Sequence, residues 1–223
     1  MAEAAALKRE LFTLIDAMRP DGGLSEEDFA HLQQLTAQIA AVSPVPEPIH
    51  QLPRVQGRWE NLFAHFGARH SAGKTRVHDS DLRTQTFSQF APLAIRATRL
   101  CQEISVNGAA YNNVVSFEAP DKSFCGNIIV RGSYRADPGG NPKRFGVEFY
   151  QAELHPQGSA SEAALRQQLG LGSDAPLEKA FKSPRLHSDI VYLDDDIRIN
   201  VGSYGGLYVL RRLNEAGVSV AVS

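Results

Sequence analysis

Two short stretches of the sequence carry residues that could bind a nucleotide and its metal ion. The first, ARHSAGKT, runs from Ala68 to Thr75 and is close to a phosphate-binding P-loop, with alanine in place of the first glycine. In the second, four apolar residues from Ile190 to Leu193 lead into Asp194 and Asp195, as in a strand whose terminal carboxylates hold Mg²⁺. Taken together, the two stretches would indicate a nucleotide hydrolase.

The surrounding sequence does not support nucleotide hydrolysis. A P-loop works because it joins a buried parallel strand to a helix whose N-terminal amides face the phosphates. The residues after Thr75, RVHDSDLRTQTFSQF, show no amphipathic helix, and the chain offers consecutive strands in place of strand–helix–strand units. We therefore interpret SAGKT as a polar loop and predict no catalytic residues.

The remaining metal-ligating residue types do not form a recognisable site either. The aspartates at 194–196 lack a second acidic cluster, and the seven histidines are dispersed, with His65 and His70 at no common ligand spacing. Cys101 and Cys125 are too few and too far apart for a zinc motif. We expect free thiols, with a disulfide as the alternative, and we predict no metal, no cofactor and no enzymatic activity.

The aspartates are better explained as partners of arginines in a β-hairpin. Centring the turn on SYGG pairs Val201 with Tyr208, Ile199 with Leu210, and Ile197 with Arg212. Asp195 then shares a mostly apolar face with Arg212 and lies diagonal to it, whereas Arg198 and Asn200 fall on the opposite face. Since a buried carboxylate is costly unless it is paired, we predict an ion pair between Asp195 and Arg212.

Helical spacing dominates the first forty residues. Apolar residues recur every three or four positions from Leu7 to Met18, and again from Phe29 to Ile39 after a break at residues 19–23. Ser25 is the expected N-cap of the second helix, because three acids follow it. The proline-rich residues 43–49 form an extended connector, so that residues 1–48 are predicted as one unit and residues 49–223 as a second.

Beyond the prolines the apolar period becomes two, which is typical of β-strands. Strands are predicted over residues 99–104, 111–118, 124–135, 144–150 and from Ile190 onward. One helix, SASEAALRQQLG, interrupts them, with Ser159 or Ser161 as its cap and Gly170 as its end. The fold class is therefore α+β and mainly β, with an antiparallel sheet that curls into a barrel or a sandwich.

Composition excludes several partners. The chain has 223 residues and a formal net charge of −2, and its basic residues are scattered, which disfavours nucleic-acid binding and a polybasic membrane patch. No apolar run approaches the roughly 20 residues that span a bilayer. The start, MAEAAALKRELF, lacks the pattern of a signal peptide and carries acids that transit peptides avoid. We expect a cytoplasmic protein, or a mature form without its leader.

The stretch YLDDDIRI…G…GGLYVLRR, Tyr192 to Arg212, closely resembles the C-terminal signature of the plastid lipid-associated protein family, also called the fibrillin or plastoglobulin family. GRWENLF (57–63), CQEIS…YNNVVSFEAP (101–120) and RFGVEFYQAEL (144–154) match it too, as do the two leading helices. The resemblance runs from about Leu7, is weak over residues 71–97, and leaves the helix near Ser161 as a local insertion. Lacking a transit peptide, the chain looks like a bacterial member.

This resemblance implies a lipocalin-like barrel that carries a hydrophobic small molecule such as a fatty acid or an isoprenoid, with peripheral contact to membranes or lipid bodies. In the G-x-W of lipocalins, the tryptophan closes one end of the barrel and a late-strand arginine packs across it. Gly57 and Trp59 match this element, and the arginine is Arg211 or Arg212, of which the hairpin register favours Arg212. The alternative function is an interaction module whose N-terminal helices dock a partner enzyme or a membrane.

A barrel of about eight strands encloses room for packed side chains or one small ligand. The predicted inward-facing residues are Phe63, Leu100, Ile104, Tyr111, Val115, Phe117, Phe124, Ile128, Val130, Phe145, Val147, Phe149, Ile197, Ile199, Tyr208 and Leu210, with Gln102, Asn113, Asp195 and Arg212 as polar exceptions. An apolar wall with a few polar groups suits an amphiphile with a polar head. The predicted ligand-binding residues are Trp59, Phe63, Gln102, Tyr111, Asn113, Phe117, Phe149, Asp195, Tyr208 and Arg212. The ligand itself and the oligomeric state stay open.

Overall fold

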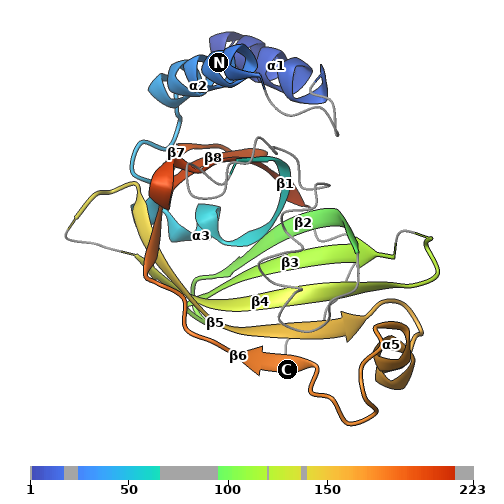
Figure 1. The fold of residues 1–223 in the computed structure, drawn as a ribbon. Coiled ribbons are helices and arrows are strands. Elements are labelled where there is room, and N and C mark those ends of the chain that lie inside the picture. The colour runs from blue at the N-terminus through green and yellow to red at the C-terminus, as the bar shows by residue number, and fades with distance from the viewer. Residues whose placement is uncertain (1, 18–24, 66–94, 120, 137–139, 214–223) are drawn as a thin grey trace.

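The computed structural model describes residues 2–17, 25–65, 95–119, 121–136 and 140–213 (Figure 1). The P-loop-like stretch Ala68–Thr75 lies outside the described residues. In chain order the elements are α1 (Ala2–Ala17), α2 (Glu26–Ala41), η1 (Pro48–His50), α3 (Leu52–Val55), β1 (Gly57–His65), β2 (Arg96–Ser105), β3 (Ala110–Glu118), β4 (Cys125–Ala136), β5 (Arg144–Pro156), α5 (Glu162–Gln168), β6 (Glu178–Ala180), β7 (Leu186–Leu193), β8 (Ile197–Gly202), η3 (Ser203–Gly205) and β9 (Leu207–Leu213).

Eight antiparallel strands close into a barrel. Their order is β4-β3-β2-β1-β9-β8-β7-β5, and pairing between β4 and β5 joins the two ends of the sheet. The short strand β6 adds to the outer edge of β5, as Figure 1 shows. The predicted fold class, a mainly β chain with a lipocalin-like barrel, is therefore confirmed.

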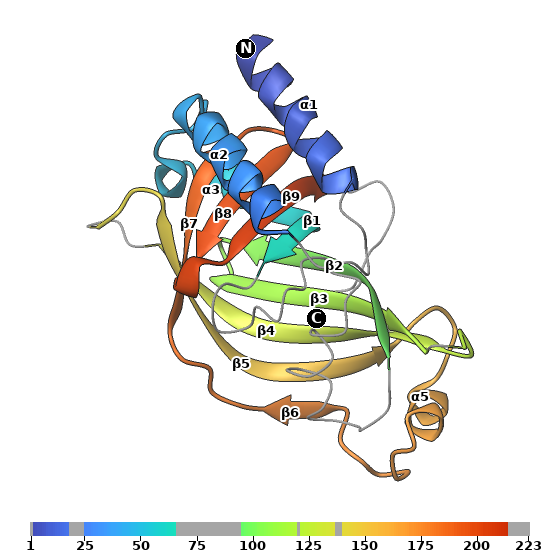
Figure 2. The same ribbon diagram turned by 45° about the horizontal axis from the view of Figure 1, so that its top comes forward.

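The N-terminal helical pair covers one outer face of this barrel (Figure 2). Ser25 caps α2 by accepting a hydrogen bond from the backbone N–H of Asp28 at 3.0 Å, as its position before three acids predicted. The apolar stripes of α1 and α2 pack against outward-facing side chains of β1, β7, β8 and β9. This outer apolar cluster comprises Leu11, Ile15, Leu32, Ile39, Phe63, Tyr192, Ile197, Ile199, Leu207 and Val209.

Two further apolar clusters lie at the two ends of the barrel interior. The first, which we call the closed-end cluster, includes Val45, Val55, Trp59, Ile104, Tyr111, Tyr134, Phe145, Val147, Ile190, Leu193 and Leu210. The second, the α5-end cluster, includes Ala64, Ile95, Ala97, Leu100, Val115, Phe117, Ile128, Val130, Leu154, Leu165, Leu169 and Leu177. Phe149 and Tyr208 contact both clusters, so they lie between the two ends.

The predicted register of the last hairpin is wrong by one residue. Val201 pairs with Leu207 and Ile197 with Arg211, because the connection from Gly202 to Gly206 has five residues. Tyr204 and Gly205 adopt positive φ there, which lets the chain reverse in this odd-numbered loop. A one-residue slip moves every side chain of a strand to the other face. Ile197 and Ile199 therefore face the helices, and Arg198 and Asn200 face the interior.

The prediction that Phe63 faces the interior is also wrong. The pairing of β1 with β9 shifts between Asn61 and Phe63, which marks a β-bulge. Trp59 and Asn61 point into the barrel before the bulge and Ala64 after it, whereas Phe63 is fully buried beneath the helical pair. The alternation of apolar residues in WENLFAH could not reveal this extra residue.

The inserted helix was predicted correctly. Ser161 is its N-cap and accepts a hydrogen bond from the backbone N–H of Ala164 at 3.2 Å. Leu165 and Leu169 are buried against the barrel in the α5-end cluster. Cys101 and Cys125 are free thiols, so the disulfide alternative does not apply. Over the residues described, no helix has the length and apolar character that crossing a membrane requires.

Candidate functional site

A polar layer separates the two apolar clusters inside the barrel. Successive inward-facing positions on β2 read Leu100, Gln102 and Ile104, so that an amide lies between an apolar residue of each cluster. Asn113 of β3 is paired with Gln102. On β1, Asn61 lies between Trp59 of the closed-end cluster and Ala64 of the α5-end cluster. From β8 come Arg198 and Asn200. We call Asn61, Gln102, Asn113, Arg198 and Asn200 the polar layer.

Arg198 is the charged member of this layer and is wholly buried, with 0% of its surface exposed. Its Nη2 donates to Oε1 of Gln102 at 2.5 Å. Because β1 and β9 separate β2 from β8 in the sheet, this hydrogen bond crosses the barrel interior. The guanidinium also lies 4.9 Å from the centre of the Trp59 ring. Burial lowers the pKa of Arg198 to about 10, so the group is still charged at neutral pH.

Several buried polar atoms of the layer have no hydrogen-bond partner among the described residues. They are Nε and Nη1 of Arg198, Oδ1 and Nδ2 of Asn61, Oδ1 of Asn113 and Oδ1 of Asn200. The hydroxyl of Tyr134, in the adjoining closed-end cluster, is also unpaired. Folded proteins pair the large majority of their buried polar groups, so a concentration of unpaired ones in one place needs a specific explanation.

The closed end of the barrel is built around Trp59 and Arg212. The Arg212 guanidinium lies 4.1 Å from the centre of the Trp59 ring, and Nε1 of Trp59 donates to the carbonyl of Val55 in α3 at 2.9 Å. Nε and Nη1 of Arg212 donate to the carbonyls of Asp195 and Gln56, both at 2.9 Å, and its Nη2 donates to the carbonyl of Arg54. The prediction that Arg212 packs across the tryptophan of the G-x-W is confirmed.

Gly57 makes this packing possible. Its φ is +124°, a conformation that residues with a side chain rarely adopt, and an added Cβ would lie 3.0 Å from Nη1 of Arg212. The glycine and the tryptophan of the G-x-W therefore act together: one lets the backbone approach the guanidinium, and the other supplies the ring beneath it.

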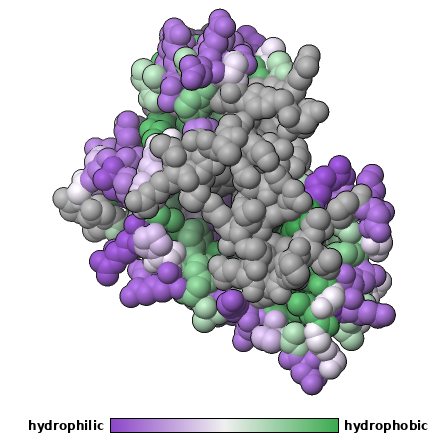
Figure 3. Space-filling view, viewed as in Figure 1, coloured by the Kyte–Doolittle hydropathy of each residue, from purple (hydrophilic) through white to green (hydrophobic). Residues whose placement is uncertain are grey.

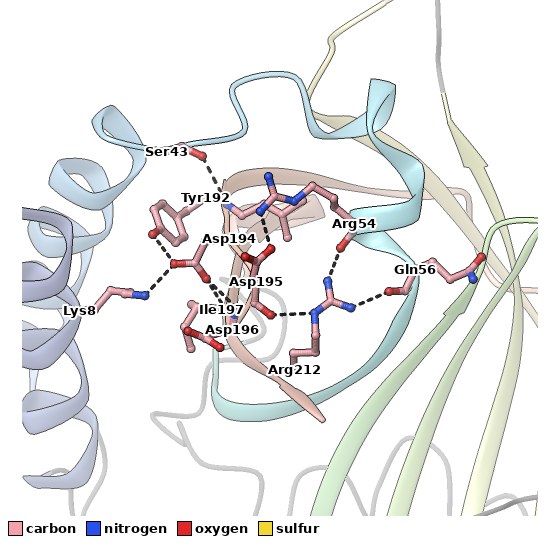
Figure 4. A network of polar contacts seen from close by, with 11 residues as sticks. Lys8, Ser43, Arg54, Gln56, Tyr192, Asp194, Asp195, Asp196, Ile197 and Arg212 are labelled. Atoms are coloured by element: carbon pink, nitrogen blue, oxygen red, sulfur yellow. Dashed lines mark hydrogen bonds and ion pairs between the residues drawn. The ribbon is translucent and has the colours of Figure 1, made fainter. Parts of the chain in front are cut away.

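Asp194 organises the turn between β7 and β8 (Figure 4). Its Oδ1 accepts hydrogen bonds from the backbone N–H groups of Asp196 and Ile197, at 2.9 and 2.7 Å. Its Oδ2 accepts from Nζ of Lys8 in α1 at 2.7 Å and from the hydroxyl of Tyr192 at 2.6 Å. One carboxylate thus holds the turn and ties helix α1 to the barrel. Within the described part of the chain, no group of His, Cys, Asp or Glu residues could hold a metal ion.

The predicted ion pair between Asp195 and Arg212 is not present. Asp195 lies in the turn beyond the end of β7, its side chain is 89% exposed, and its carboxylate pairs with Nη2 of Arg54 at 2.6 Å. Arg212 contacts only the backbone carbonyl of Asp195 (Figure 4). The aspartate does partner an arginine, but a different one, because the strand ends two residues before Asp195 and turns its side chain outward.

Replacing Asp194 with asparagine should lower the free energy of unfolding by about 2 kcal/mol at pH 7, since hydrogen bonds to a charged group are lost. Burial by itself raises the pKa of Asp194, but the bonds from Lys8, Tyr192 and the two amides outweigh it, so its pKa lies below the ordinary 3.8. A lowered folded-state pKa means that this stabilisation is complete above pH 3.8 and is lost as the pH falls through the folded pKa.

Urea unfolding of both proteins at pH 7 and at about pH 2.5 checks this prediction. The stability difference between wild type and Asp194→Asn should shrink at the lower pH. Asp196→Asn is the matched control, because Asp196 contributes its backbone atoms to the turn. An equal loss of stability at both pH values would contradict the assigned role of the carboxylate.

The structure brings eight of the ten predicted ligand-binding residues into or against the barrel interior: Trp59, Gln102, Tyr111, Asn113, Phe117, Phe149, Tyr208 and Arg212. Phe63 and Asp195 lie outside it. Burial raises the pKa of Tyr208 to about 12, which fits its position deep between the clusters. Sequence reasoning missed Asn61, Arg198 and Asn200, and the hairpin register was the one signal that could have found the last two.

Comparison with known proteins adds independent information. A model of the PAP_fibrillin family matches residues 5–211. The chain is 24% identical over 236 residues to "Plastoglobulin-1, chloroplastic" from Pisum sativum, covering 92% of this chain and 60% of that protein. It is 25% identical to "Probable plastid-lipid-associated protein 3, chloroplastic" from Oryza sativa subsp. japonica, covering 83% of this chain and 53% of that protein. The counterpart from Arabidopsis thaliana is 24% identical, with 82% and 51% covered. The chain thus spans between half and 60% of the length of these relatives.

Proposed function

The chain belongs to the PAP_fibrillin family, and from this premise we propose that its barrel binds one lipid-like amphiphile and carries it without catalysing a reaction. Fatty acids and isoprenoids are the ligand classes we put forward. The names of the relatives, a plastoglobulin and a probable plastid-lipid-associated protein, support an association with lipid. Peripheral contact with a membrane or lipid body is part of the proposal, and a cytoplasmic location stays a prediction.

The observation that carries the proposal is the polar layer between two apolar clusters. An eight-stranded barrel holds either packed side chains or one small ligand. If side chains alone filled this interior, its polar atoms would be expected to bond with one another. Those of Asn61, Arg198 and Asn200 nevertheless include atoms to which the described part of the chain offers no partner. A ligand with a polar head would pair with such atoms, and its tail would lie among the apolar residues beside them.

The alternative, docking of a partner through the N-terminal helices, has less support. Docking by an amphipathic helix needs an apolar face that is open to the partner. The apolar stripes of α1 and α2 are already packed on the barrel through Leu11, Ile15, Leu32 and Ile39. In Figure 3 the outer surface of the helical pair, at the top, is mostly hydrophilic. Among the described residues the exposed large hydrophobic side chains are Tyr150 and Tyr204, and neither belongs to these helices.

We expect the purified protein to yield a lipid when it is extracted with organic solvent and analysed by mass spectrometry. After lipid removal it should bind cis-parinaric acid at about one molecule per barrel. Trp59 is the only tryptophan of the chain and lies in the interior, so energy transfer from its fluorescence to the bound polyene reports occupancy. Urea-unfolded protein is the control. Absence of both an extracted lipid and saturable binding would contradict the proposal.

A further inference from the structure

We infer that Arg198 binds the head group of the ligand and that this head group is a carboxylate. The inference rests on the proposed function and makes it specific, because it selects acids over neutral lipids of the same length. Three observations carry it. The guanidinium of Arg198 is buried, two of its nitrogens have no described partner, and the nitrogens of Arg212 are all bonded to backbone carbonyls.

Arg198 is a buried cation without an anionic partner among the described residues. Its hydrogen-bond partner is the neutral amide of Gln102. The ion pairs of the described arginines, such as Arg131 with Glu153 and Arg144 with Asp189, involve other residues. Taking a charge out of water is costly unless an opposite charge meets it. An anion inside the barrel would compensate the charge that the protein leaves uncompensated.

The geometry of the guanidinium fits a carboxylate. Nη2 donates one hydrogen to Gln102 at 2.5 Å, while Nε and Nη1 donate to no described group. The second N–H of Nη2, together with Nε or Nη1, forms a pair of neighbouring donors. A guanidinium presents five N–H donors in a rigid plane, and two neighbouring donors match the two oxygens of a carboxylate. Gln102 holds this plane from the opposite wall of the barrel, so the donors are positioned before a ligand arrives.

The charge available indicates a single negative charge on the ligand. Arg212 also lies beside the Trp59 ring, but its Nε, Nη1 and Nη2 all donate to backbone carbonyls at the closed end. Lys8 is outside the barrel and pairs with Asp194. Among the described residues, a phosphate or diphosphate head, with two or more charges, would meet one uncommitted guanidinium inside the barrel. A monoanionic carboxylate balances it.

The tail of the ligand would extend away from the closed end. That end is capped, because Arg212 covers the Trp59 ring and Nε1 of Trp59 bonds to the carbonyl of Val55 in α3. On the other side of the polar layer lie Leu100, Val115 and Phe117, with Phe149 and Tyr208 between the levels. The apolar side chains at this end would contact a hydrocarbon chain. Burial of that chain would contribute affinity in the same way for ligands with charged and with neutral head groups.

The test compares cis-parinaric acid with its methyl ester, which has the same polyene tail and an uncharged head. In the lipid-free wild-type protein the acid should bind at least about tenfold more tightly, since a hydrogen-bonded ion pair is replaced by weaker contacts in the ester. In Arg198→Met the acid should bind no more tightly than the ester, whose affinity should stay within about threefold of its wild-type value. Arg211→Met is the matched control, because Arg211 is exposed and pairs with Glu60 on the outside.

Thermal unfolding of the lipid-free variants separates a ligand-binding role from a structural one. Removing an uncompensated buried charge should leave the melting temperature of Arg198→Met unchanged or higher. If Arg198 had a purely structural role, replacing it would lower the melting temperature and change the binding of acid and ester alike. If Arg198→Met does not fold, Arg198→Lys serves instead, and its preference for the acid should fall severalfold because an ammonium lacks the planar pair of donors.

The remaining outcomes are distinct. Equal binding of acid and ester by the wild type, or an unchanged preference in Arg198→Met, would overturn this inference and leave the proposed function standing. Tighter binding of hexadecyl phosphate than of palmitic acid would overturn the assignment of a carboxylate. A folded wild-type protein that binds neither probe would overturn the proposed function and this inference with it.

Discussion

Replacing Arg212 with alanine is expected to lower the free energy of unfolding by about 3 kcal/mol, one of the two largest effects that we predict. The guanidinium donates hydrogen bonds to three backbone carbonyls, of Arg54, Gln56 and Asp195, which belong to the α3 segment and to the β7–β8 turn. It also covers the Trp59 ring at 4.1 Å. One side chain therefore joins α3, the turn and β1, and alanine removes all these contacts at once.

Urea unfolding followed by circular dichroism measures this loss, and Trp59 fluorescence gives a second, local readout. The emission of the folded variant should move to longer wavelength, because water reaches a ring that is fully buried in the wild type. Arg211→Ala is the control, because Arg211, the neighbour of Arg212 in β9, makes an exposed ion pair with Glu60. Loss of this ion pair should cost less than about 1 kcal/mol. Equal effects of the two substitutions would show that the closed end does not depend on Arg212.

Lysine at position 212 should restore only part of the stability. An ammonium keeps the positive charge and can interact with the Trp59 ring, but it is a compact group on a flexible stem. It cannot reach three carbonyls that a planar guanidinium contacts with three separate nitrogens. The difference between Arg212→Lys and Arg212→Ala therefore separates the contribution of charge from that of hydrogen-bond geometry.

The elements of the fold and its closed end could be predicted from the sequence because their signals are local or chemically distinctive. Apolar residues at helical spacing and the cap at Ser25 locate α2 within a residue or two. Tyr111, Val115 and Phe117 recur at even spacing on one face, and the strand predicted from them over residues 111–118 reproduces β3. Gly57, Trp59 and Arg212 form one unit whose residue types are each hard to replace. Few other residue types could adopt the positive φ of Gly57, supply the ring of Trp59, or donate to three carbonyls as Arg212 does.

Gln102 and Asn113 of the polar layer were predicted to face inward, but Asn61, Arg198 and Asn200 could not be, because their facing depends on register. Arg198 and Asn200 alternate with Ile197 and Ile199, and a sheet with apolar residues on one face normally turns that face to the core. Here both faces of β8 are covered, the isoleucines by the helices and the polar residues by the barrel. The length of the hairpin loop decides which set of β8 faces inward, and the bulge between Asn61 and Phe63 does the same for β1.

A fully buried arginine on such a strand has consequences for stability as well as for binding. Apolar residues of similar size at position 198 would avoid the desolvation of a charge, so the barrel gives up stability to keep a guanidinium in its interior. Residues that reduce stability in this way are concentrated at functional sites. The burial of Arg198 therefore supports the proposed function independently of the unpaired atoms around it.

Replacing both Leu11 and Leu32 with alanine is the change for which we expect the largest loss of stability, roughly 5 kcal/mol in total. Both side chains are fully buried between the helices and the outer face of the barrel. Truncating a buried leucine typically costs about 2 to 5 kcal/mol, from lost burial and from the cavity that remains. The sum falls short of twice the larger value because the two sites belong to one cluster, where neighbouring substitutions are not additive.

Urea unfolding monitored by circular dichroism and by Trp59 fluorescence measures this effect. Gln34→Ala, at an exposed position of α2, is the control and should change stability by less than about 0.5 kcal/mol. The two signals report different regions, the helices and the closed end of the barrel, and the outer apolar cluster joins helices to barrel. We therefore expect a single coincident transition in the wild type. Two separate transitions would show that residues 1–48 fold as a unit of their own, and the leucine substitutions would then leave the barrel transition unchanged.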